Sequence, residues 1–508
     1  MTGGLFVVQI RTDRFDFSRS TDVLARGNGR ISRVMEAASS VAASALGLDR
    51  VGRVETRGVD FIPESERRSR PRDLAWVFFG GQLCYGSILV GSLPVAWGLS
   101  WWGAFSSILV GSLLGSLGFA VLAMIGPKAG TNATVTSCAF FGIRGRYVGS
   151  LITQVITLGF FALQLWVSTP PLVAAAARLW NTPADAVALT IGLAVVTGLV
   201  LLVNALGHAT LVLLAKLTAV TNVFSMAALV VCAASAFTGA PADSGYLLGG
   251  FWPTWALSTM MAISNAISYA PFASDYTRYM PARTCGRALF GWGLFGMVTG
   301  TVVSLSCGAF IALALAGGGE VLSRMVAVLP LALVLPVILV GLIGNVTNAG
   351  LNAYNGTLDL HALLWRLRRV QVSFLFGGVG IVLGWLGLVV FDMTSSTEAL
   401  CSLVTVLVTP WIAINVLGYW RAGGRFAVAD LQAFEGRRGA YWYQGGYNLR
   451  AILAWVVGVV VGLLFVGTDI FTGPLANLAD GVDLSFLSSA AVSSLLYLLM
   501  TAKAADPR

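Results

Sequence analysis

Four asparagines lie close together in a strongly apolar stretch of the sequence. They fall within eleven residues, at Asn345, Asn348, Asn352 and Asn355. Asn348 and Asn352 are four residues apart, so they share one face of a helix. In a lipid-like surrounding, such amides are unfavourable unless they meet water, a ligand or each other. The pattern predicts either a binding site for a polar, uncharged solute or an internal hydrogen-bond network, and the sequence leaves both open.

Two further apolar stretches are interrupted by small and polar residues. One runs from Gly80-Gly81-Gln82 to Tyr85-Gly86, and the other contains Asn265, Ser268 and Tyr269 before Pro271. Such residues in the middle of an apolar segment predict a discontinuous helix, whose freed backbone groups bind solutes and ions in transporters. Close helix packing through small residues is the alternative interpretation. In a third stretch Phe160 precedes Gln164 by one turn, which places an aromatic face beside an amide.

Charged side chains are scarce in these apolar stretches, which limits the chemistry. Lys216 is the one charge expected clearly inside an apolar segment, and no carboxylate is expected at a depth where it could relay a proton. His208 and His361 lie far apart, and no two cysteines have the spacing of a metal site. A membrane-embedded enzyme would need acids, bases or metal ligands there. The sequence therefore favours binding of a flat, neutral heterocycle over catalysis.

The composition predicts that these residues sit in membrane-spanning helices. Of 508 residues, 56% are hydrophobic and 11% are charged, whereas soluble domains carry about 25% charged residues. The apolar runs are long and do not alternate, which predicts an all-α polytopic membrane protein rather than a barrel. With about 20 residues per span, we expect twelve transmembrane helices, over 74–97, 101–125, 150–177, 185–206, 209–237, 251–272, 288–316, 326–357, 371–391, 397–419, 450–468 and 484–502.

Positive charge predicts the orientation of these helices. The formal net charge is +9. With the N-terminus inside, the loops after the first span and the C-terminal tail carry sixteen Lys and Arg residues on the inner side and two on the outer side. Basic residues gather on the cytoplasmic side, so we expect a multi-pass protein of the cytoplasmic (inner) membrane with both termini cytoplasmic. Because these charges lie in short loops, nucleic acid is not an expected partner; the bilayer and a small heterocyclic solute are.

The chain is expected to have four regions. Residues 1–72 form a cytoplasmic, largely disordered arm, and Met35 is an alternative to Met1 as the start. Residues 73–420 form the transport core of ten helices. Residues 421–449 form a cytoplasmic loop, and residues 450–508 hold the last two helices and the C-terminal tail.

Three motifs occur in the order found in a known family. They are Glu55-Thr56-Arg57-Gly58-Val59 with Ile62-Pro63-Glu64-Ser65-Glu66-Arg67, then Gly126-Pro127-Lys128-Ala129-Gly130 with Phe141-Gly142-Ile143-Arg144-Gly145, and Pro271-Phe272-Ala273-Ser274-Asp275-Tyr276-Thr277-Arg278-Tyr279-Met280-Pro281. They resemble segments of the nucleobase–cation symporter family, which includes the purine/cytosine permeases and the allantoin, uracil and hydantoin transporters. The resemblance extends over about residues 51–500.

The resemblance implies a leucine-transporter-type fold, with a five-plus-five inverted repeat followed by two C-terminal helices. It implies a cation-coupled symporter that imports a neutral nucleobase or related heterocycle by alternating access, such as cytosine, purine, uracil, allantoin or hydantoin. Ala266 replaces a stacking residue of the family, and Ser268 or Tyr269 is expected to compensate. The predicted substrate-binding residues are Phe160, Gln164, Asn265, Ser268, Tyr269, Asn348, Asn352, Gln82 and Gly86.

The resemblance also implies a coupling-ion site built mostly from main-chain oxygens. Its predicted members are Gly81, Tyr85, Ile343, Val346 and Thr347. Family members with a clear sodium site tend to carry two hydroxyls where this chain has Val346-Thr347, so one hydroxyl is missing. The lack of a proton-relaying carboxylate favours Na⁺ as the coupling ion, and H⁺ is the alternative. No other cofactor is expected.

Other functions fit the sequence less well. An amino-acid or vitamin-precursor transporter of the same fold is the main alternative. A channel does not call for two broken helices flanking an amide cluster. The sequence does not determine the heterocycle or the oligomeric state.

Overall fold

The computed structural model describes residues 59–502, apart from 206, 242–244, 316–320, 365, 391, 434–438, 469 and 479–480. The chain divides into two compact units, Met1–Leu48 and Asp49–Arg508, and every described residue belongs to the second unit. The expectations for residues 1–58, including the start at Met35, therefore lie outside the described residues.

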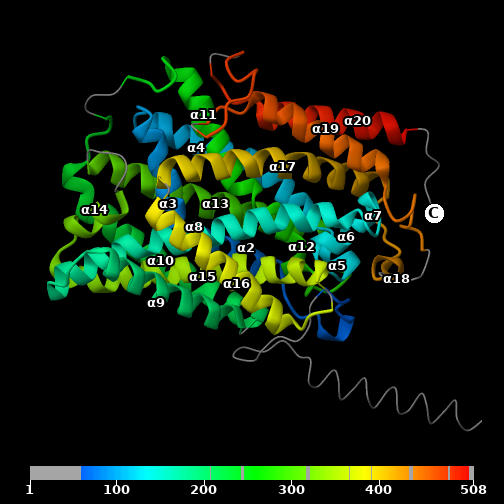
Figure 1. Cartoon of the computed structure of the whole chain (residues 1–508), viewed down its shortest axis with the longest axis horizontal. Helices are drawn as coiled ribbons and strands as arrows, with labels where there is room; N and C mark the ends of the chain where they lie inside the picture. The colour runs from blue at the N-terminus through cyan, green and yellow to red at the C-terminus, as the bar shows by residue number, and fades with distance from the viewer. Residues whose placement is uncertain are drawn as a thin grey trace, which may run out of the picture. The chain divides into compact units, whose positions relative to one another are not determined.

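The described residues are mainly helical, with two isolated β-bridges, between Gln444 and Tyr447 and between Gly467 and Thr472. In chain order (Figure 1) the elements are η1 (Glu64–Glu66), α2 (Pro71–Gln82), α3 (Tyr85–Ala96), α4 (Trp101–Leu122), α5 (Gly126–Ala129), α6 (Ala133–Thr136), α7 (Cys138–Phe141), α8 (Arg146–Trp180), α9 (Ala186–Ala205), α10 (Gly207–Ala233), η2 (Ala234–Ala236), α11 (Phe251–Ile267), η3 (Ala270–Phe272), α12 (Ala273–Thr277), α13 (Gly286–Ala314), α14 (Val321–Val328), α15 (Leu331–Leu363), α16 (Arg369–Val390), α17 (Met393–Arg421), α18 (Val428–Leu431), α19 (Leu449–Phe465) and α20 (Ser485–Thr501).

Eight of the described helices are long and apolar enough to cross a membrane, and the bent pair α2 and α3 makes a ninth if it is one span. The apolar helices α19 and α20 are shorter. A helix lies in each of the twelve predicted ranges, which confirms the all-α polytopic class. The count of twelve spans and the inverted repeat stay predictions.

The first predicted span is broken at its glycine-rich run, as the sequence indicated. α2 ends at Gln82 and α3 begins at Tyr85, and the two helices are bent by 63°. The Leu83 amide donates to the Gly80 carbonyl and the Cys84 amide to the Gln82 carbonyl, which makes a tight turn. The sixth predicted span is interrupted as well, because α11 ends at Ile267 and the short η3 and α12 follow.

Glycines in this run and in the helix that follows it, α3, also pack helices together. A Cβ on Gly80 would lie 2.1 Å from the Ala215 oxygen of α10, and a Cβ on Gly91 would lie 2.0 Å from the Leu305 oxygen of α13. Small residues let membrane helices approach backbone to backbone in this way. The two interpretations of the run, a break and close packing, therefore both hold.

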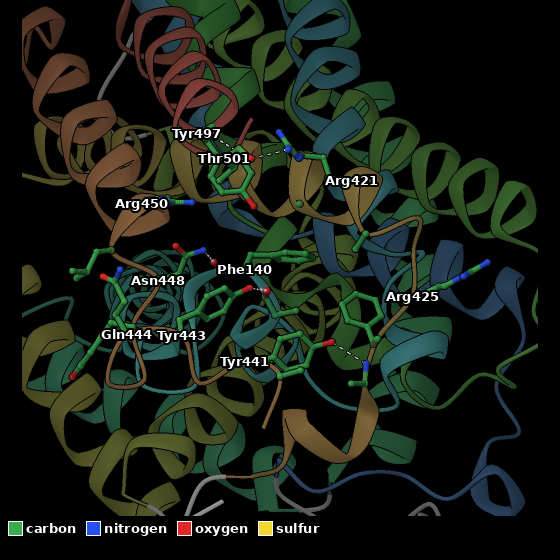
Figure 2. A pocket seen from close by; sticks show the side chains of 18 residues that line it. Phe140, Arg421, Arg425, Tyr441, Tyr443, Gln444, Asn448, Arg450, Tyr497 and Thr501 are labelled. Carbon is green, nitrogen blue, oxygen red and sulfur yellow. Dashed lines mark hydrogen bonds between the residues drawn. The ribbon is translucent and has the colours of Figure 1, made fainter. Parts of the chain in front are cut away.

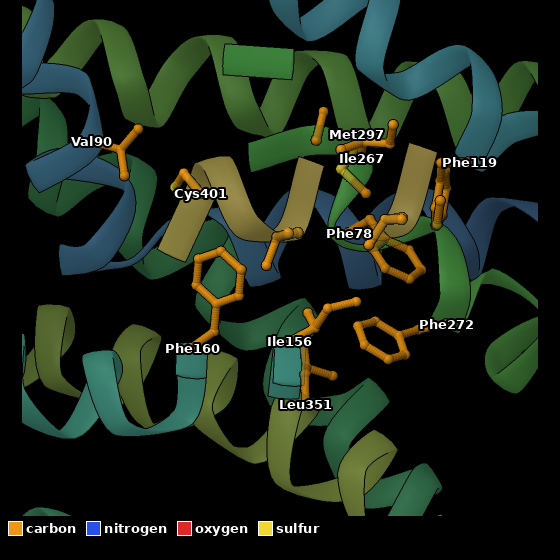
Figure 3. Close-up of a cluster of buried hydrophobic side chains, with 14 of the residues drawn as sticks. Phe78, Val90, Phe119, Ile156, Phe160, Ile267, Phe272, Met297, Leu351 and Cys401 are labelled. Atoms are coloured by element: carbon orange, nitrogen blue, oxygen red, sulfur yellow. The ribbon is translucent and has the colours of Figure 1, made fainter. Parts of the chain in front are cut away.

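The long helices pack in neighbouring groups (Figure 1). α8 packs along α15 and α16, α13 packs against α2, α3 and α4, and α19 and α20 pack on each other and on α17. A buried apolar cluster lies among these groups, where Phe78 of α2 meets Phe119 of α4 edge-on at 4.5 Å. Figure 3 shows the Phe160 ring pointing from α8 toward Cys401 of α17 in this cluster.

The three family-like motifs, which are far apart in the sequence, contact one another. The Ile62 amide donates to the Gly130 carbonyl at 2.8 Å, and Gly126 lies against Thr277 and Arg278. The Ser69 amide, two residues after the first motif, donates to the Tyr279 carbonyl at 3.0 Å. The Arg67 guanidinium donates to the Pro127 carbonyl at 2.7 Å. Gly130 ends α5 with φ of +66°, a conformation that glycine adopts without steric cost. The motifs thus build one structural unit beside the ends of α2 and α4.

Candidate functional site

The side chain of Asn348 is the centre of a hydrogen-bond network at the break between α2 and α3. Its Nδ2 donates to the Gly81 carbonyl at 2.5 Å and to the Tyr269 hydroxyl at 2.7 Å. Its Oδ1 accepts from Gln164 Nε2 and from Asn352 Nδ2, each at 3.0 Å. An amide has two N–H donors and two acceptor lone pairs, so all four positions of Asn348 are used. This residue of α15 joins α2, α8 and the segment that follows α11.

Gln164 and Phe160 project from α8 as neighbours one turn apart. Gln164 is buried, and its Nε2 also contacts the Cys84 sulfur at 3.6 Å. A Cβ on Gly86 would lie 2.7 Å from Gln164 Nε2, so glycine at this position leaves room for the amide. The Phe160 ring is 8% exposed and lies in the apolar layer between α8 and α17 (Figure 3).

The interrupted sixth span supplies the third side of the network. The Tyr269 ring packs edge-on against Phe78 at 5.9 Å, which directs its hydroxyl to Asn348. Asn265 is buried, and its carbonyl accepts from the Ser268 hydroxyl at 2.8 Å. The structure therefore brings Tyr269 to the amide network, and it places Asn265 and Ser268 together at the end of α11.

Six buried side-chain amide oxygens have no hydrogen-bond partner within the described residues, and Gln164 Oε1 and Asn265 Oδ1 belong to predicted substrate-binding residues. Buried polar atoms are nearly always hydrogen-bonded, and an unpaired one costs about 1–3 kcal/mol. The Tyr269 hydroxyl accepts from Asn348 and keeps its own proton for donation. The side chains at the break thus offer acceptors and a donor, all uncharged, near an aromatic ring. A flat neutral ring with N–H and C=O groups has complementary chemistry.

Two polar side chains near the break, those of Gln82 and Asn345, form hydrogen bonds within the protein. Gln82 was predicted to bind substrate, but its Nε2 donates to the Met297 sulfur of α13 at 3.2 Å and its Oε1 accepts from Ser87 at 3.4 Å. Asn345 donates to the Gln164 carbonyl at 2.6 Å and to the Ser168 hydroxyl. The internal network that the sequence left open is therefore present, and it contains predicted binding residues.

The carbonyl oxygens at the helix break accept from side-chain amides. Asn348 donates to Gly81, and Asn222 Nδ2 of α10 donates to the Leu83 carbonyl at 2.5 Å. Asn222 was not predicted, because a single asparagine in the fifth apolar stretch carries no motif. Both donors supply N–H groups where a coupling cation would need oxygen atoms.

The predicted cation-binding residues of α15 point in different directions. The Thr347 hydroxyl donates to the Ile343 carbonyl at 2.8 Å and lies 3.0 Å from the Thr218 hydroxyl of α10. Val346 instead packs in an apolar cluster with residues of α8 and α9. The Tyr85 hydroxyl donates to a carbonyl of α15 at 3.1 Å. The arrangement offers a metal ion few oxygen ligands.

Two carboxylates outside the predicted spans are buried in the structure. Asp275 of α12 is 0% exposed and Asp359 of α15 is 1% exposed. Asp359 lies inside α15, past the predicted end of the eighth span at residue 357, because that helix continues to Leu363. Its place in the series of polar residues that begins at Asn348, at steps of three or four, is a signal that could have identified it.

A cavity of about 710 Å³ lies elsewhere, at the end of α17 and beside α19 and α20 (Figure 2). Its lining includes Arg421, Arg425 and Arg450 and several tyrosines, and it contains no carboxylate among the described residues. None of the predicted substrate-binding residues lines this cavity. Its positive charge does not suit a neutral heterocycle, so we do not assign it to the substrate.

Comparisons with known proteins converge on transport. Residues 61–487 match the family described as permease for cytosine/purines, uracil, thiamine, allantoin. The chain is 25% identical over 467 residues to "Putative purine-cytosine permease YxlA" of Bacillus subtilis (strain 168), covering 88% of this chain and 96% of that protein. The structure is similar to Mhp1, a nucleobase-cation-symport-1 family transporter with bromovinylhydantoin bound, with TM-score 0.68, 16% identity and coverage of 88% and 94%. It is also similar to a Na⁺-coupled sialic acid symporter, with TM-score 0.55, 12% identity and coverage of 86% and 90%.

Proposed function

The chain belongs to the family of permeases for cytosine and purines, uracil, thiamine and allantoin, and on that premise we propose that it imports a neutral nucleobase or related heterocycle together with a cation. The resemblance stated from the motifs is confirmed, and the protein is a transporter rather than an enzyme. The proposed cycle is alternating access, in the cytoplasmic membrane, with both termini in the cytoplasm.

The observation that carries the proposal is the uncharged network around Asn348 at the broken first helix. Its members come from α2, α8, α15 and the interrupted sixth span. We assign the Phe160 face to ring stacking, and Gln164 and Asn352 to hydrogen bonds with the ring edge. A ring N–H reaching Gln164 Oε1 would satisfy an oxygen that has no partner within the described residues.

The charge of the network favours a neutral heterocycle over an amino acid. The Asn348 network contains no Lys, Arg or His, and Lys216, in α10, is paired with Asp73 at 2.7 Å. A solute carboxylate buried here would have no cationic partner, which is costly in a desolvated site. This argues against the amino-acid alternative.

The test is a thermal-shift screen of the purified full-length protein against cytosine, uracil, purines, allantoin, hydantoin, thiamine and L-phenylalanine. A bound ligand raises the unfolding temperature in proportion to the logarithm of its concentration over Kd. We expect a neutral heterocycle to stabilise the protein and Gln164→Ala to remove that effect. The matched control is Asn415→Ala in α17, a buried amide that bonds to its own helix at the Trp411 carbonyl. Stabilisation by L-phenylalanine alone, or a heterocycle effect that Gln164→Ala leaves unchanged, would contradict the proposal.

The residues at the helix break also bear on the identity of the coupling cation. Amide donors occupy the oxygens at the break, and Val346 supplies no hydroxyl. These observations weigh against the sodium site that the family resemblance implied. They direct attention to the buried carboxylates as the place where a proton could bind.

A further inference from the structure

A group of buried charges lies further along α15 from the amide network. It contains Asp359 of α15, Asp275 of α12 and Arg278, which follows α12. All three side chains are at most 1% exposed. Two consecutive residues hold the carboxylates, because the Ala133 amide donates to Asp275 Oδ1 and Asn132 Nδ2 donates to Asp359 Oδ1, each at 2.9 Å.

The two carboxylates differ in the hydrogen bonds that they accept. Asp275 accepts from the Ala133 amide through Oδ1, and its Oδ2 is buried and finds no partner within the described residues. Asp359 accepts from Asn132, and the buried hydroxyls of Thr134 in α6 and Thr153 in α8 lie beside its carboxylate as further donors. Asp275 Oδ2 is therefore the oxygen of the pair that lacks a donor.

The charges of the group do not balance when both acids are ionised. Arg278 contributes one positive charge, which can neutralise only one of the two carboxylates. The Arg278 guanidinium also donates to the Tyr354 hydroxyl of α15 at 3.2 Å and to the Tyr279 hydroxyl at 3.4 Å. A second ionised carboxylate in a fully buried group is strongly unfavourable. The group is neutral once a single proton is added.

The charged residues of the neighbouring elements have other surroundings. Arg146 of α8, which packs against α6 and α15, lies beside Cys138 and over the Tyr147 ring, and His361 is two residues from Asp359 and so lies on a different face of α15. α4 and α6, which pack against α12, carry no charged residue. Lys128 of α5 bonds to the Tyr419 hydroxyl, and Asp73 of α2 pairs with Lys216. The titratable neighbours are tyrosines, of which Tyr276 lies beside Asp275 and Tyr354 beside Arg278. Burial, together with the nearby Asp359, raises the pKa of Asp275 well above its usual range.

We propose that Asp275 and Asp359 form a proton-binding site in which the two carboxylates share one proton beside Arg278. The step is simple protonation: one carboxylate oxygen gains a proton, and no other bond changes. A proton fits better than a metal ion, since no group of three or more His, Cys, Asp or Glu residues that could hold a metal occurs among the described residues. Its use as the coupling ion rests on the proposed transport function, whereas the site itself does not.

The site is placed to link protonation to helix movement. It joins α12, which follows the broken sixth span, to α15, which carries Asn348, and to the α6 segment. Loss of the proton leaves two like charges buried near each other between these elements. Because linkage is reciprocal, a conformation that separates α12 from α15 would bind the proton less tightly.

The first experiment is an infrared pH titration of the purified full-length protein, following the C=O stretch of protonated carboxyl groups. We expect a band at neutral pH that disappears at alkaline pH. Asp275→Asn and Asp359→Asn should each abolish this band, because the remaining carboxylate then pairs with Arg278 and ionises. Asn keeps an acceptor oxygen for Ala133 or Asn132, and Asp73→Asn, which removes an acid already paired with Lys216, is the matched control that should keep the band.

Three results would overturn the site. They are a wild-type protein without the band at neutral pH, a band lost in only one of the two Asn variants, and a band removed by sodium at constant pH. The wild-type titration needs no variant, so the proposal remains testable if a substitution prevents folding.

The second experiment tests coupling in proteoliposomes with radiolabelled cytosine. We expect both Asn variants to lose accumulation driven by a proton gradient and to retain counterflow exchange, which needs no net proton movement. Gradient-driven accumulation equal to wild type in both variants would overturn the coupling role. If neither the wild-type protein nor the variants bind or exchange cytosine, the result counts against cytosine as the substrate. The infrared result on the proton site is then unaffected.

Discussion

The amide network and the carboxylate pair each have a member on α15, but they differ in charge. Asn348 and Asp359 are eleven residues apart on α15, which is about 16 Å along a helix axis. Around Asn348, every interaction is between neutral groups that can exchange partners with a solute. Around Asp359, full charges are enclosed, and only a change in protonation alters their balance. Under the proposed function, α15 carries substrate recognition in its middle and proton binding toward its end.

The substitution expected to change thermal stability most is Arg278→Met, and it tests whether the group around Asp359 depends on charge. Removing the guanidinium leaves two buried acids without a counter-charge, and breaking a buried pair in this way costs about 3–5 kcal/mol. We expect a sharply lower unfolding temperature, measured by intrinsic fluorescence in detergent. Adding Asp275→Asn and Asp359→Asn to Arg278→Met should restore much of the loss. A triple variant as unstable as the single one would show that Arg278 acts through packing and not through charge.

A smaller effect, confined to recognition, is expected from Asn352→Ala. The substitution removes a donor to Asn348 and a proposed partner of the heterocycle, so we expect substrate affinity to fall by about 1–3 kcal/mol. Without substrate, the unfolding temperature of the Asn352→Ala variant should be no lower than that of the Asn415→Ala control. Isothermal titration or the thermal-shift assay measures both quantities, and unchanged affinity would remove Asn352 from the site.

The carboxylate pair should also make stability depend on pH. The pKa of Asp275 is raised in the folded protein by burial and by Asp359, so the folded state binds more protons than the unfolded state above the ordinary Asp pKa. Stability is therefore fully present below that ordinary value and is lost as pH rises through the raised one. We expect the unfolding temperature to fall with increasing pH over this window. Asp275→Asn should flatten the curve, and an equally steep curve in that variant would assign the effect to other groups.

The smallest effect is expected at the predicted sodium site. Val346 packs toward α8 and α9, so Val346→Ser should not create a sodium ligand, although the sequence alone predicted that it would strengthen a sodium effect. We expect sodium to leave heterocycle affinity unchanged in both proteins, measured by titration at fixed ionic strength. Tighter binding with sodium, enhanced in Val346→Ser, would restore sodium as the coupling ion and confine the carboxylate pair to a structural role.

The sequence by itself determined the features that depend on local composition and spacing. Long apolar runs predicted the helices, because backbone groups in lipid must be satisfied within each segment. The run at Gly80-Gly81-Gln82 predicted the break, and the four-residue spacing of Asn348 and Asn352 predicted a shared polar face. The motif around Arg278 indicated the family, but the sequence did not show that Asp359 lies near Arg278.

Only the tertiary structure decided which helix each polar face meets. The direction of Gln82 toward Met297, of Val346 into an apolar cluster and of Asn222 onto the Leu83 carbonyl follows from the rotation and contacts of whole helices. The proximity of Asp275 to Asp359 likewise relates residues 84 positions apart. Helical periodicity states which residues share a face of one helix. It carries no information on the partner of that face, because the partner is set by packing between segments distant in the sequence.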